Sequence, residues 1–226
     1  MKGTIIYGNG AMARVLHSYA RHTMNIVAFT VDDHCIAPTA QEFCGLPLLP
    51  FSSVARTLAP ADHSLIVAVG YLHMNDLRRR KREEARGMGY ASASYVHPDV
   101  MRHDGTTLGE GCIILDHVSI HPGCRIDDGV FISSNVNIGH DCVVGEDSWI
   151  NAGVAVAGGS SIGARCFLGV NASVGHGVSI GERNYISANT FIGADTQADQ
   201  VYLSEAGQRL KMRSLDFLAM TEGSES

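Results

Sequence analysis

The chain has 226 residues and a mass of 24.1 kDa, which allows one large domain or two small ones, each with a core. Its hydrophobic content of 45% and charged content of 18% exclude a disordered chain, and its net charge of −6 argues against a general nucleic-acid binder. The longest wholly apolar run has five residues, far short of the ~20 that span a bilayer, so we expect no membrane segment. The N-terminus lacks a signal-peptide pattern and the six cysteines include no CxxC pair, so we expect a reduced, cytoplasmic protein.

The first part of the chain alternates strand-like and helix-like segments. An amphipathic stretch follows residue 10, and the other segments predict three buried strands, at 3–7, 25–31 and 65–69, and a helix at 73–88. This alternation is typical of a small parallel sheet with covering helices. His97-Pro98 predicts a boundary, so we expect a Rossmann-like α/β domain over residues 1–96.

A glycine loop joins the first predicted strand to the amphipathic stretch. Gly8, Gly10 and Ala13 fit the pattern G-x-G-x-x-G/A, and Asp32 and Asp33 lie ~20 residues further on, where a ribose-binding acid is expected. The loop could bring backbone and a helix N-terminus close to a phosphate, or it could be a tight turn without a ligand. About 95 residues suffice for only one half of a dinucleotide domain, so a nucleotide-sugar fits better than NAD, and an oxidoreductase is disfavoured.

Five successive basic residues, Arg78 to Arg82, precede Glu83 and Glu84. On a helix these side chains point all around the axis. We therefore expect a solvated helix with local ion pairs.

A six-residue period dominates the second part of the chain. Fifteen consecutive positions spaced by six are aliphatic: Leu108, Ile114, Ile120, Ile126, Ile132, Ile138, Val144, Ile150, Val156, Ile162, Leu168, Val174, Ile180, Ile186 and Ile192. Four residues after each of them lies a mostly small residue, and four of the six cysteines fall in this column, which predicts compact inward-facing groups rather than metal ligands. Glycine often follows the aliphatic residue directly, where we expect a sharp bend.

This period predicts a parallel β-helix, because short strands joined by bends repeat in six residues whereas helices and flat sheets do not. Three hexads make a triangular coil of eighteen residues, so residues 108–197 predict five coils and a prism ~24 Å tall. We expect the prism domain over residues 97–198 and a tail over 199–226. The repeat block carries nine acidic residues against three arginines and no lysine, so the negative charge of the chain belongs to the prism.

The eighteen-residue coil stacks His140, Gly158 and His176 in one outward column, and Asp141 follows His140. A histidine beside a carboxylate is a simple general base, because the acid orients the ring and stabilises its charged form. Each histidine could also be an ordinary surface or interface residue, and this alternative is stronger for His176 than for His140.

Three stretches resemble one family: IGHDCVVGE at 138–146, CFLGVNASV at 166–174 and IIYGNG at 5–10, with AVGY at 68–71 in support. Over residues 3–197 the chain resembles the sialic-acid O-acetyltransferases and bacillosamine N-acetyltransferases (NeuD/PglD type), which join a nucleotide-sugar-binding α/β domain to a hexapeptide-repeat prism. The resemblance implies a left-handed β-helix, a homotrimer, acetyl-CoA as co-substrate in a groove between prisms, and no metal.

The resemblance also implies roles for individual residues. His140 matches the general base, and Asp141 matches the acid that supports it. Further matches are Trp149, Gly158, Val170 and Ala188 for acetyl-CoA, and Gly8, Asn9, Gly10, Asp32, Asp33 and Gly70 for the nucleotide-sugar. Two departures are Ala11-Met12, where the family often carries a histidine near the sugar, and residues 204–217, which replace the usual G-x-P-A-K ending.

Two further features have two interpretations each. Trp149 could contact coenzyme or pack at a subunit interface. Arg165 and Arg183 stack with Asp147 at intervals of eighteen residues, so they could meet coenzyme phosphates or form a structural acid–base ladder.

These observations favour an acetyl-CoA-dependent N-acetyltransferase that acts on a nucleotide-linked amino-sugar in lipopolysaccharide or another surface glycan. Transfer to a hydroxyl is the runner-up within the class. A zinc hydratase on the same prism would need three ligands, but only His140 and His176 have the right spacing, and Gly181 holds the third place. A non-catalytic assembly or sugar-sensing module stays open, because the fold alone does not fix the function.

Overall fold

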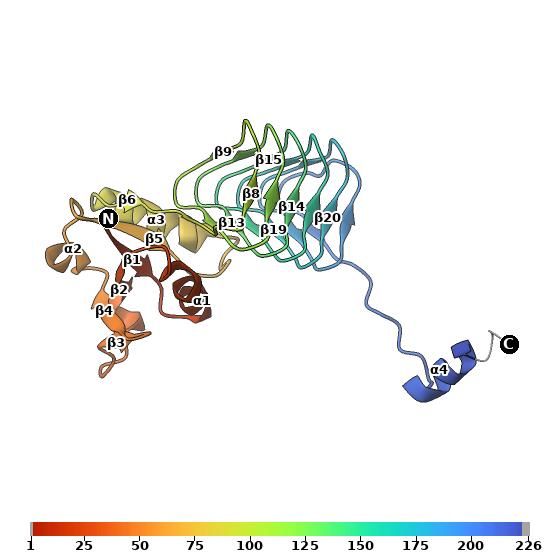
Figure 1. Ribbon diagram of the computed structural model, residues 1–226, viewed down its shortest axis with the longest axis horizontal. Coiled ribbons are helices and arrows are strands. Elements are labelled where there is room, and N and C mark those ends of the chain that lie inside the picture. The colour runs from red at the N-terminus through yellow and green to blue at the C-terminus, as the bar shows by residue number, and fades with distance from the viewer. Residues whose placement is uncertain (1, 223–226) are drawn as a thin grey trace.

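The computed structural model describes residues 2–222, which form an α/β domain, a prism and a C-terminal arm (Figure 1). The α/β domain contains a six-stranded sheet in the order β3-β4-β2-β1-β5-β6, and only β3 runs antiparallel to its neighbour. Its strands are β1 (Gly3–Tyr7), β2 (Ile26–Val31), β3 (Glu42–Phe43), β4 (Leu46–Pro50), β5 (His63–Val67) and β6 (Ala91–Ser92), and its helices are α1 (Ala11–Ala20), α2 (Val54–Thr57) and α3 (Asp76–Gly87).

The three strands and the two helical segments expected in this domain are therefore present, with ends shifted by a few residues. The hairpin of β3 and β4 was not expected, because Leu46–Pro50 contains two prolines and proline is depleted in strands. Ile5, Ile6 and Phe29 of the sheet pack with Leu16 of α1 in the core of this domain.

The prism is a left-handed β-helix with three parallel faces, and its two-residue strands pair with the strand eighteen residues later, except that β22 (Tyr185–Ile186) pairs with β24 (Val201–Tyr202) sixteen residues later. The first face contains β7 (Tyr95–Val96), β10 (Ile113–Ile114), β13 (Phe131–Ile132), β16 (Trp149–Ile150), β19 (Phe167–Leu168), β22 (Tyr185–Ile186) and β24 (Val201–Tyr202). The second face contains β8 (Met101–Arg102), β11 (Ser119–Ile120), β14 (Asn137–Ile138), β17 (Ala155–Val156), β20 (Ser173–Val174) and β23 (Phe191–Ile192). The third face contains β9 (Thr107–Leu108), β12 (Arg125–Ile126), β15 (Val143–Val144), β18 (Ser161–Ile162) and β21 (Ser179–Ile180). The strands of the third coil, for example, are β13 (Phe131–Ile132), β14 (Asn137–Ile138) and β15 (Val143–Val144).

The coils begin earlier than the aliphatic pattern predicts. β7 pairs with β10 and β8 (Met101–Arg102) pairs with β11, so the stack already exists before Leu108. Arg102 occupies the position that is in phase with the aliphatic column, and this charged residue interrupts the pattern although the backbone continues it. At the other end β24 (Val201–Tyr202) extends the first face past residue 197.

The aliphatic column and the small column fill the interior of the prism, as predicted. Four cysteines of the small column are buried, and each thiol donates a hydrogen bond to a carbonyl of the chain fifteen residues later: Cys112, Cys124, Cys142 and Cys166. Burial raises the pKa of the Cys112 and Cys166 thiols to about 11. These cysteines are therefore structural donors inside the prism.

The glycines that follow the aliphatic column have a different role from the one expected. Gly139 has no left-handed backbone, and instead a Cβ there would lie 2.6 Å from the backbone nitrogen of Gly158 in the next coil. The left-handed corners come two residues later, for example at Asp141 with φ 56° and at Gly159 with φ 70°. Close approach between coils, rather than the bend itself, therefore requires glycine at position 139.

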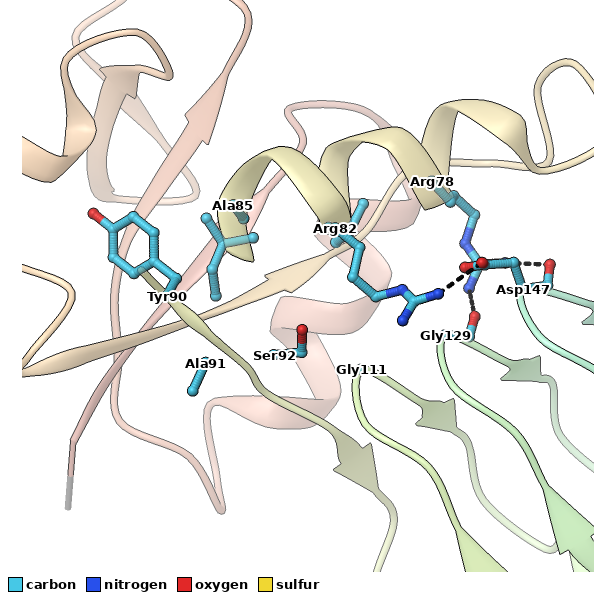
Figure 2. A pocket seen from close by; sticks show the side chains of 11 residues that line it. Arg78, Arg82, Ala85, Tyr90, Ala91, Ser92, Gly111, Gly129 and Asp147 are labelled. Carbon is cyan, nitrogen blue, oxygen red and sulfur yellow. Dashed lines mark hydrogen bonds and ion pairs between the residues drawn. The ribbon is translucent and has the colours of Figure 1, made fainter. Parts of the chain in front are cut away.

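The basic helix α3 fastens the α/β domain to the prism, which corrects the expectation of a solvated helix. Arg78 and Arg82 are buried, and Figure 2 shows both reaching from α3 toward Asp147 of the prism. The Arg82 guanidinium lies 2.7 Å from the Asp147 carboxylate, and Arg78 donates to the carbonyls of Gly129 and Asp147. Of the five basic residues, only Arg79 and Arg80 are not buried.

An aromatic column on the first face completes the junction. Trp149 on β16 (Trp149–Ile150) stacks on Phe131 with ring centroids 3.9 Å apart, and the Arg78 guanidinium lies 5.2 Å from the Trp149 ring. Phe167 stacks on Tyr185 in the same way, at 4.6 Å. The α/β domain therefore covers the first face and leaves the corner between the second and third faces to solvent.

The C-terminal arm leaves the last coil and ends in α4 (Ser214–Glu222), which lies apart from the prism (Figure 1). Leu210, Leu215 and Phe217 of the arm are exposed. No helix within residues 2–222 has the length and apolarity that crossing a bilayer would require.

Candidate functional site

A cavity of ≈ 830 Å³ opens between the α/β domain and the first face of the prism. We call it the nucleotide cavity, because its size is ample for a nucleotide-sized ligand and the glycine loop lines it. Its lining is largely apolar and consists of Tyr7, Gly8, Asn9, Gly10, Ala11, Met12, Val15, Val31, Asp32, His34, Cys35, Ala68, Val69, Gly70, Leu72, Leu77, Arg80 and Trp149.

The glycine loop shapes one wall of this cavity. Gly8 has φ 134°, and a Cβ there would lie 2.6 Å from the carbonyl oxygen of Ala68, so the chain needs glycine to leave β1 beside β5. A Cβ on Gly10 would meet nothing within 4 Å, so this position faces open space. Helix α1 begins directly after it and has neither a side-chain cap nor an acid in its first turn, which leaves its positive end available to an anion.

The two acids after β2 have different positions. Asp32 lines the nucleotide cavity, and its carboxylate lies 2.7 Å from the Lys81 ammonium. Asp33 is not in the lining, and its carboxylate instead accepts hydrogen bonds from the Ser52 hydroxyl at 2.6 Å and the Ser52 backbone N–H, which lower its pKa. Burial and the nearby Asp32 raise the pKa of Tyr7, so its hydroxyl is a neutral donor in the cavity.

His140 and Asp141 form a hydrogen-bonded pair at a corner of the prism. Nδ1 of His140 lies 2.9 Å from an Asp141 carboxylate oxygen, and both side chains are exposed, by 58% and 72%. The pair lies in the turn between β14 and β15, where Asp141 has a left-handed backbone with φ 56°. With Nδ1 engaged, Nε2 is the ring nitrogen that is left to exchange a proton.

The coil above the pair lies close to its free nitrogen. A Cβ on Gly158 would clash with His140 Nε2, so glycine at this position makes room for the ring. His176 follows one coil further, and the centroids of the His140 and His176 rings are 6.3 Å apart. The predicted column of His140, Gly158 and His176 is therefore present.

Two more histidines lie along this edge, which the sequence reasoning did not single out. His103 and His121 lie in the preceding turns between the second and third faces, with ring centroids 5.6 Å apart. We call this edge, with His103, His121, His140 and His176, the histidine corner. Among residues 2–222 no group of three or more His, Cys, Asp and Glu side chains has the arrangement of a metal site, and Gly181 supplies no third ligand for His140 and His176.

The residues matched to acetyl-CoA lie in three places of a single chain. Trp149 is on the first face and lines the nucleotide cavity, and Gly158 is on the histidine corner. Val170 and Ala188 lie one coil apart in the turns that join the first face to the second, and Val170 is exposed. One chain therefore brings His140, Asp141 and Gly158 together, but it does not bring them to Trp149.

The two stacked arginines have protein partners. Arg165 and Arg183 both lie 3.4 Å from the Asp76 carboxylate at the start of α3, and they also pair with Glu182 and Asp199. Asp147, the third member of the predicted ladder, pairs with Arg82 instead. These arginines therefore contribute to the domain junction.

Several cavity residues were not predicted from the sequence. Tyr7, His34, Leu72, Leu77 and Arg80 line it, and they come from four separate segments of the chain. Leu77 and Arg80 are three residues apart and therefore on one side of α3. The one available signal was the basic run itself. Placed on a helix, it could have been tested for a side that faces the glycine loop.

Comparisons with known proteins agree with this architecture. The family described as GMPPB C-terminal domain matches residues 114–206, within the prism and the start of the arm. No curated protein sequence matches the chain.

Solved structures match nearly the whole chain. Perosamine N-acetyltransferase (PerB) from Caulobacter crescentus, solved with CoA and GDP-perosamine, is 28% identical, with a TM-score of 0.80 over 89% of this chain and 93% of that one. The acetyltransferase domain of PglB from Neisseria gonorrhoeae, solved also with acetyl coenzyme A, is 22% identical, with a TM-score of 0.76 over 86% and 93%. WeeI from Acinetobacter baumannii shares the fold at 16% identity and a TM-score of 0.55, over 88% and 94%.

The similarities to the PglB domain and to WeeI concern the fold. PerB shares the fold and also has a more similar sequence over both domains. The predicted resemblance to the sugar acetyltransferases that carry a hexapeptide-repeat prism is thereby confirmed, and these similarities support acyltransferase activity.

Proposed function

We propose that the chain transfers an acetyl group from acetyl-CoA to the amino group of a nucleotide-linked sugar. The observation that carries this proposal is the His140–Asp141 pair, held at 2.9 Å and open to solvent on a prism joined to a nucleotide cavity. PerB, which is named as a perosamine N-acetyltransferase and was solved with GDP-perosamine and CoA, supports an amine acceptor. Structures of that enzyme include variants in which one histidine is replaced by asparagine or alanine.

The chemistry follows from the free nitrogen of His140. The acceptor amine attacks the thioester carbonyl, a C–N bond forms, and Nε2 of His140 takes the proton that the amine loses. Asp141 accepts the Nδ1 hydrogen bond, so it orients the ring and stabilises the imidazolium that forms. The C–S bond then breaks, and a thiol with an ordinary pKa of about 8.5 leaves as a thiolate without strong acid help.

A backbone donor is available for the oxyanion. Within residues 2–222 the N–H of Gly159 is bonded to the His140 carbonyl, whereas the N–H of Gly158 has no hydrogen-bond acceptor. Gly158 also lies beside His140 Nε2, where the reacting carbonyl must come. We therefore assign the Gly158 N–H to the developing negative charge.

The active site needs two copies of the chain. The nucleotide cavity lies against the first face, and the histidine corner joins the other two faces, so the prism itself separates them. A neighbouring copy that packs its histidine corner beside this cavity would complete the site, with the cavity of one copy and His140 of the next. The homotrimer implied by the family provides such a neighbour for every chain.

The test is thiol release from acetyl-CoA by the purified protein, with UDP-, dTDP- and GDP-linked 3- and 4-amino sugars as acceptors. Turnover of one amino sugar, reduced ~10²- to 10⁴-fold in His140→Ala, would support both the reaction and the role of the base. Turnover that the substitution leaves unchanged would remove His140 from its role. No turnover of amino sugars, but turnover of hydroxyl analogues, would replace N-acetylation with O-acetylation, which the same dyad could perform.

A further inference from the structure

The rings of His140 and His176 lean toward each other along the histidine corner. The two residues are two coils apart, and at one strand spacing per coil this separates equivalent backbone atoms by about 10 Å. Their ring centroids are nevertheless only 6.3 Å apart. His103 and His121, which are a single coil apart, have almost the same ring separation, 5.6 Å. The side chains of His140 and His176 therefore converge on the coil between them.

Two glycines in that coil make room for the rings. A Cβ on Gly158 would lie 2.6 Å from Cδ2 of His140, and a Cβ on Gly159 would lie 3.7 Å from Cε1 of His176. One ring therefore reaches the coil from the coil before it, and the other reaches it from the coil after it. The N–H of Gly158 has no hydrogen-bond acceptor among residues 2–222. The two rings and this N–H therefore border one small space.

The two histidines differ in their surroundings. Nδ1 of His140 is hydrogen-bonded to Asp141 at 2.9 Å, and such a carboxylate suits a histidine that takes up a proton. His176 is exposed, lies between Gly175 and Gly177, and has neither a hydrogen-bond partner nor an ion-pair partner within the described residues 2–222. A neutral imidazole has one N–H donor. The ring of His176 is therefore suited to donate a hydrogen bond, and the ring of His140 to accept a proton.

The separation of the rings fits the two ends of one reacting group. In a tetrahedral intermediate, the attacking nitrogen and the oxygen of the thioester are bonded to the same carbon. A base that reaches the nitrogen and a donor that reaches the oxygen must therefore face each other across a few ångströms. The rings of His140 and His176, 6.3 Å apart, meet this requirement.

We propose that His176 is a catalytic residue, which donates a hydrogen bond to the thioester oxygen of acetyl-CoA as the second donor beside the Gly158 N–H. This inference rests on the proposed function and adds a residue to its site. As the C–N bond forms, the C=O electron pair moves to the oxygen, where the two donors stabilise the charge. The pair returns when the C–S bond breaks, and the thiolate leaves with the electrons of that bond. His176 keeps its own proton throughout, and His140 holds the proton that the amine loses.

The experiment compares the wild type with His176→Gln, which keeps an N–H donor, and with His176→Met, which has a similar length and no donor. In His176→Met, kcat should fall about 10²- to 10³-fold, while KM for acetyl-CoA and for the amino sugar should stay within about 3-fold. His176→Gln should regain at least about 10-fold of this loss. The pH profile of kcat/KM should keep its shape in both variants, because the base is His140.

The matched control is His103→Met, which changes a histidine of the same corner that lies beside His121 and away from Gly158. Its kcat should stay within about 2-fold of the wild type. Unchanged melting temperatures would show that all three variants are folded.

A second measurement uses acetyl-CoA alone and does not depend on the acceptor. Acetyl-CoA with an isotope label at the acetyl carbonyl is bound to each protein, and its C=O stretch is followed by difference infrared spectroscopy. The stretch should shift to lower wavenumber on the wild type, because a hydrogen bond to the oxygen weakens the C=O bond. His176→Met should lose part of this shift, and His176→Gln should keep it.

An unchanged kcat and an unchanged C=O stretch in His176→Met would overturn the inference. So would equal losses in His176→Met and His176→Gln, or a loss that appears in KM alone. A wild type that turns over no amino sugar, but shows the shift that depends on His176, would overturn the proposed acceptor and leave this inference standing. A wild type that does not bind acetyl-CoA would overturn both.

Discussion

The histidine corner and the nucleotide cavity differ in how the chain builds them. His140 and Asp141 are exposed, and their place follows from one turn of a repeat that recurs every eighteen residues. The nucleotide cavity is apolar, and it exists only because α3 is fastened to Asp147 and the α/β domain covers the first face. In the proposed reaction the corner supplies the proton acceptor and the cavity binds the nucleotide-sugar, and a single chain holds them on different sides of the prism. The proposed function therefore requires a boundary between two copies, where both parts can reach one substrate.

The largest effect is expected from two variants that each lack one of these parts, placed on different chains. His140→Ala removes the base, and Gly10→Trp should fill the nucleotide cavity, because a side chain at Gly10 extends into open space from a backbone that any residue adopts. Each variant alone should lose at least about 100-fold in kcat/KM. Co-expressed in equal amounts, mixed trimers should regain about a quarter of the wild-type activity, because one site in four then combines an intact cavity with an intact His140.

The control for this experiment is the double variant, His140→Ala with Gly10→Trp in one chain, co-expressed with the wild type. It should likewise leave about a quarter of the activity, since the same fraction of sites is intact. Mixtures of the two single variants that stay inactive would show that each chain completes its own site, and would overturn the shared arrangement.

A smaller effect is expected from Asp141→Asn, which tests the corner alone. Asn accepts the left-handed backbone that Asp141 adopts, with φ 56°, so the fold should persist. The imidazolium of His140 then loses its anionic partner, and kcat should fall about 10- to 100-fold with KM for the nucleotide-sugar unchanged. His117→Ala is the matched control: His117 also pairs with a neighbouring aspartate, at 3.0 Å, but lies in another column of turns. A loss of nucleotide affinity in Asp141→Asn would contradict the separation of the two regions.

The sequence allowed the column of His140, Gly158 and His176 in the corner to be predicted, but not His103 and His121, and it allowed only part of the cavity to be predicted. Stacking by eighteen placed His140, Gly158 and His176 in one column because every coil repeats the same backbone. The glycine loop was also recognised, because its spacing is local. Arg80 and Leu77 were missed because their place depends on which side of α3 meets the prism. The same missing information made the Arg78–Arg82 run look solvated, although Arg82 pairs with a carboxylate that lies far away in sequence.

The next effect concerns the junction that forms the cavity. Arg82→Met should lower the free energy of unfolding by about 3–5 kcal/mol, because it leaves the Asp147 carboxylate, 1% exposed, without its partner. Arg79→Met on the same helix should cost less than about 1 kcal/mol, since its ion pairs are exposed. The measurement is denaturant unfolding followed by the fluorescence of Trp149, the single tryptophan, which lies at this junction.

If the double variant Arg82→Met with Asp147→Asn partly recovers the free energy of unfolding, the loss in Arg82→Met is due to the unpaired Asp147 carboxylate. Asn tolerates the left-handed backbone of Asp147 and removes the buried charge. Equal losses for Arg82→Met and Arg79→Met would instead mean that α3 is not fastened through this ion pair. The histidine corner contacts neither residue, so binding of coenzyme A should survive all of these substitutions.

The smallest effect is a pH dependence at the second attachment of the two domains. Asp116 of the prism accepts hydrogen bonds from the hydroxyls of Ser134 and Tyr19 of α1 and from His117, and these bonds lower its pKa to about 2, below its usual value of 3.8. A carboxyl with a depressed pKa stabilises the folded state fully above pH 3.8, and this contribution is lost as the pH falls through about 2. It amounts to no more than about 2.5 kcal/mol. In urea unfolding between pH 5 and 2, Asp116→Asn should flatten this part of the profile, and Ser134→Ala, which removes the largest cause of the shift, should move the loss to higher pH. An unchanged profile in both variants would assign the acid sensitivity to other carboxylates of the acidic prism.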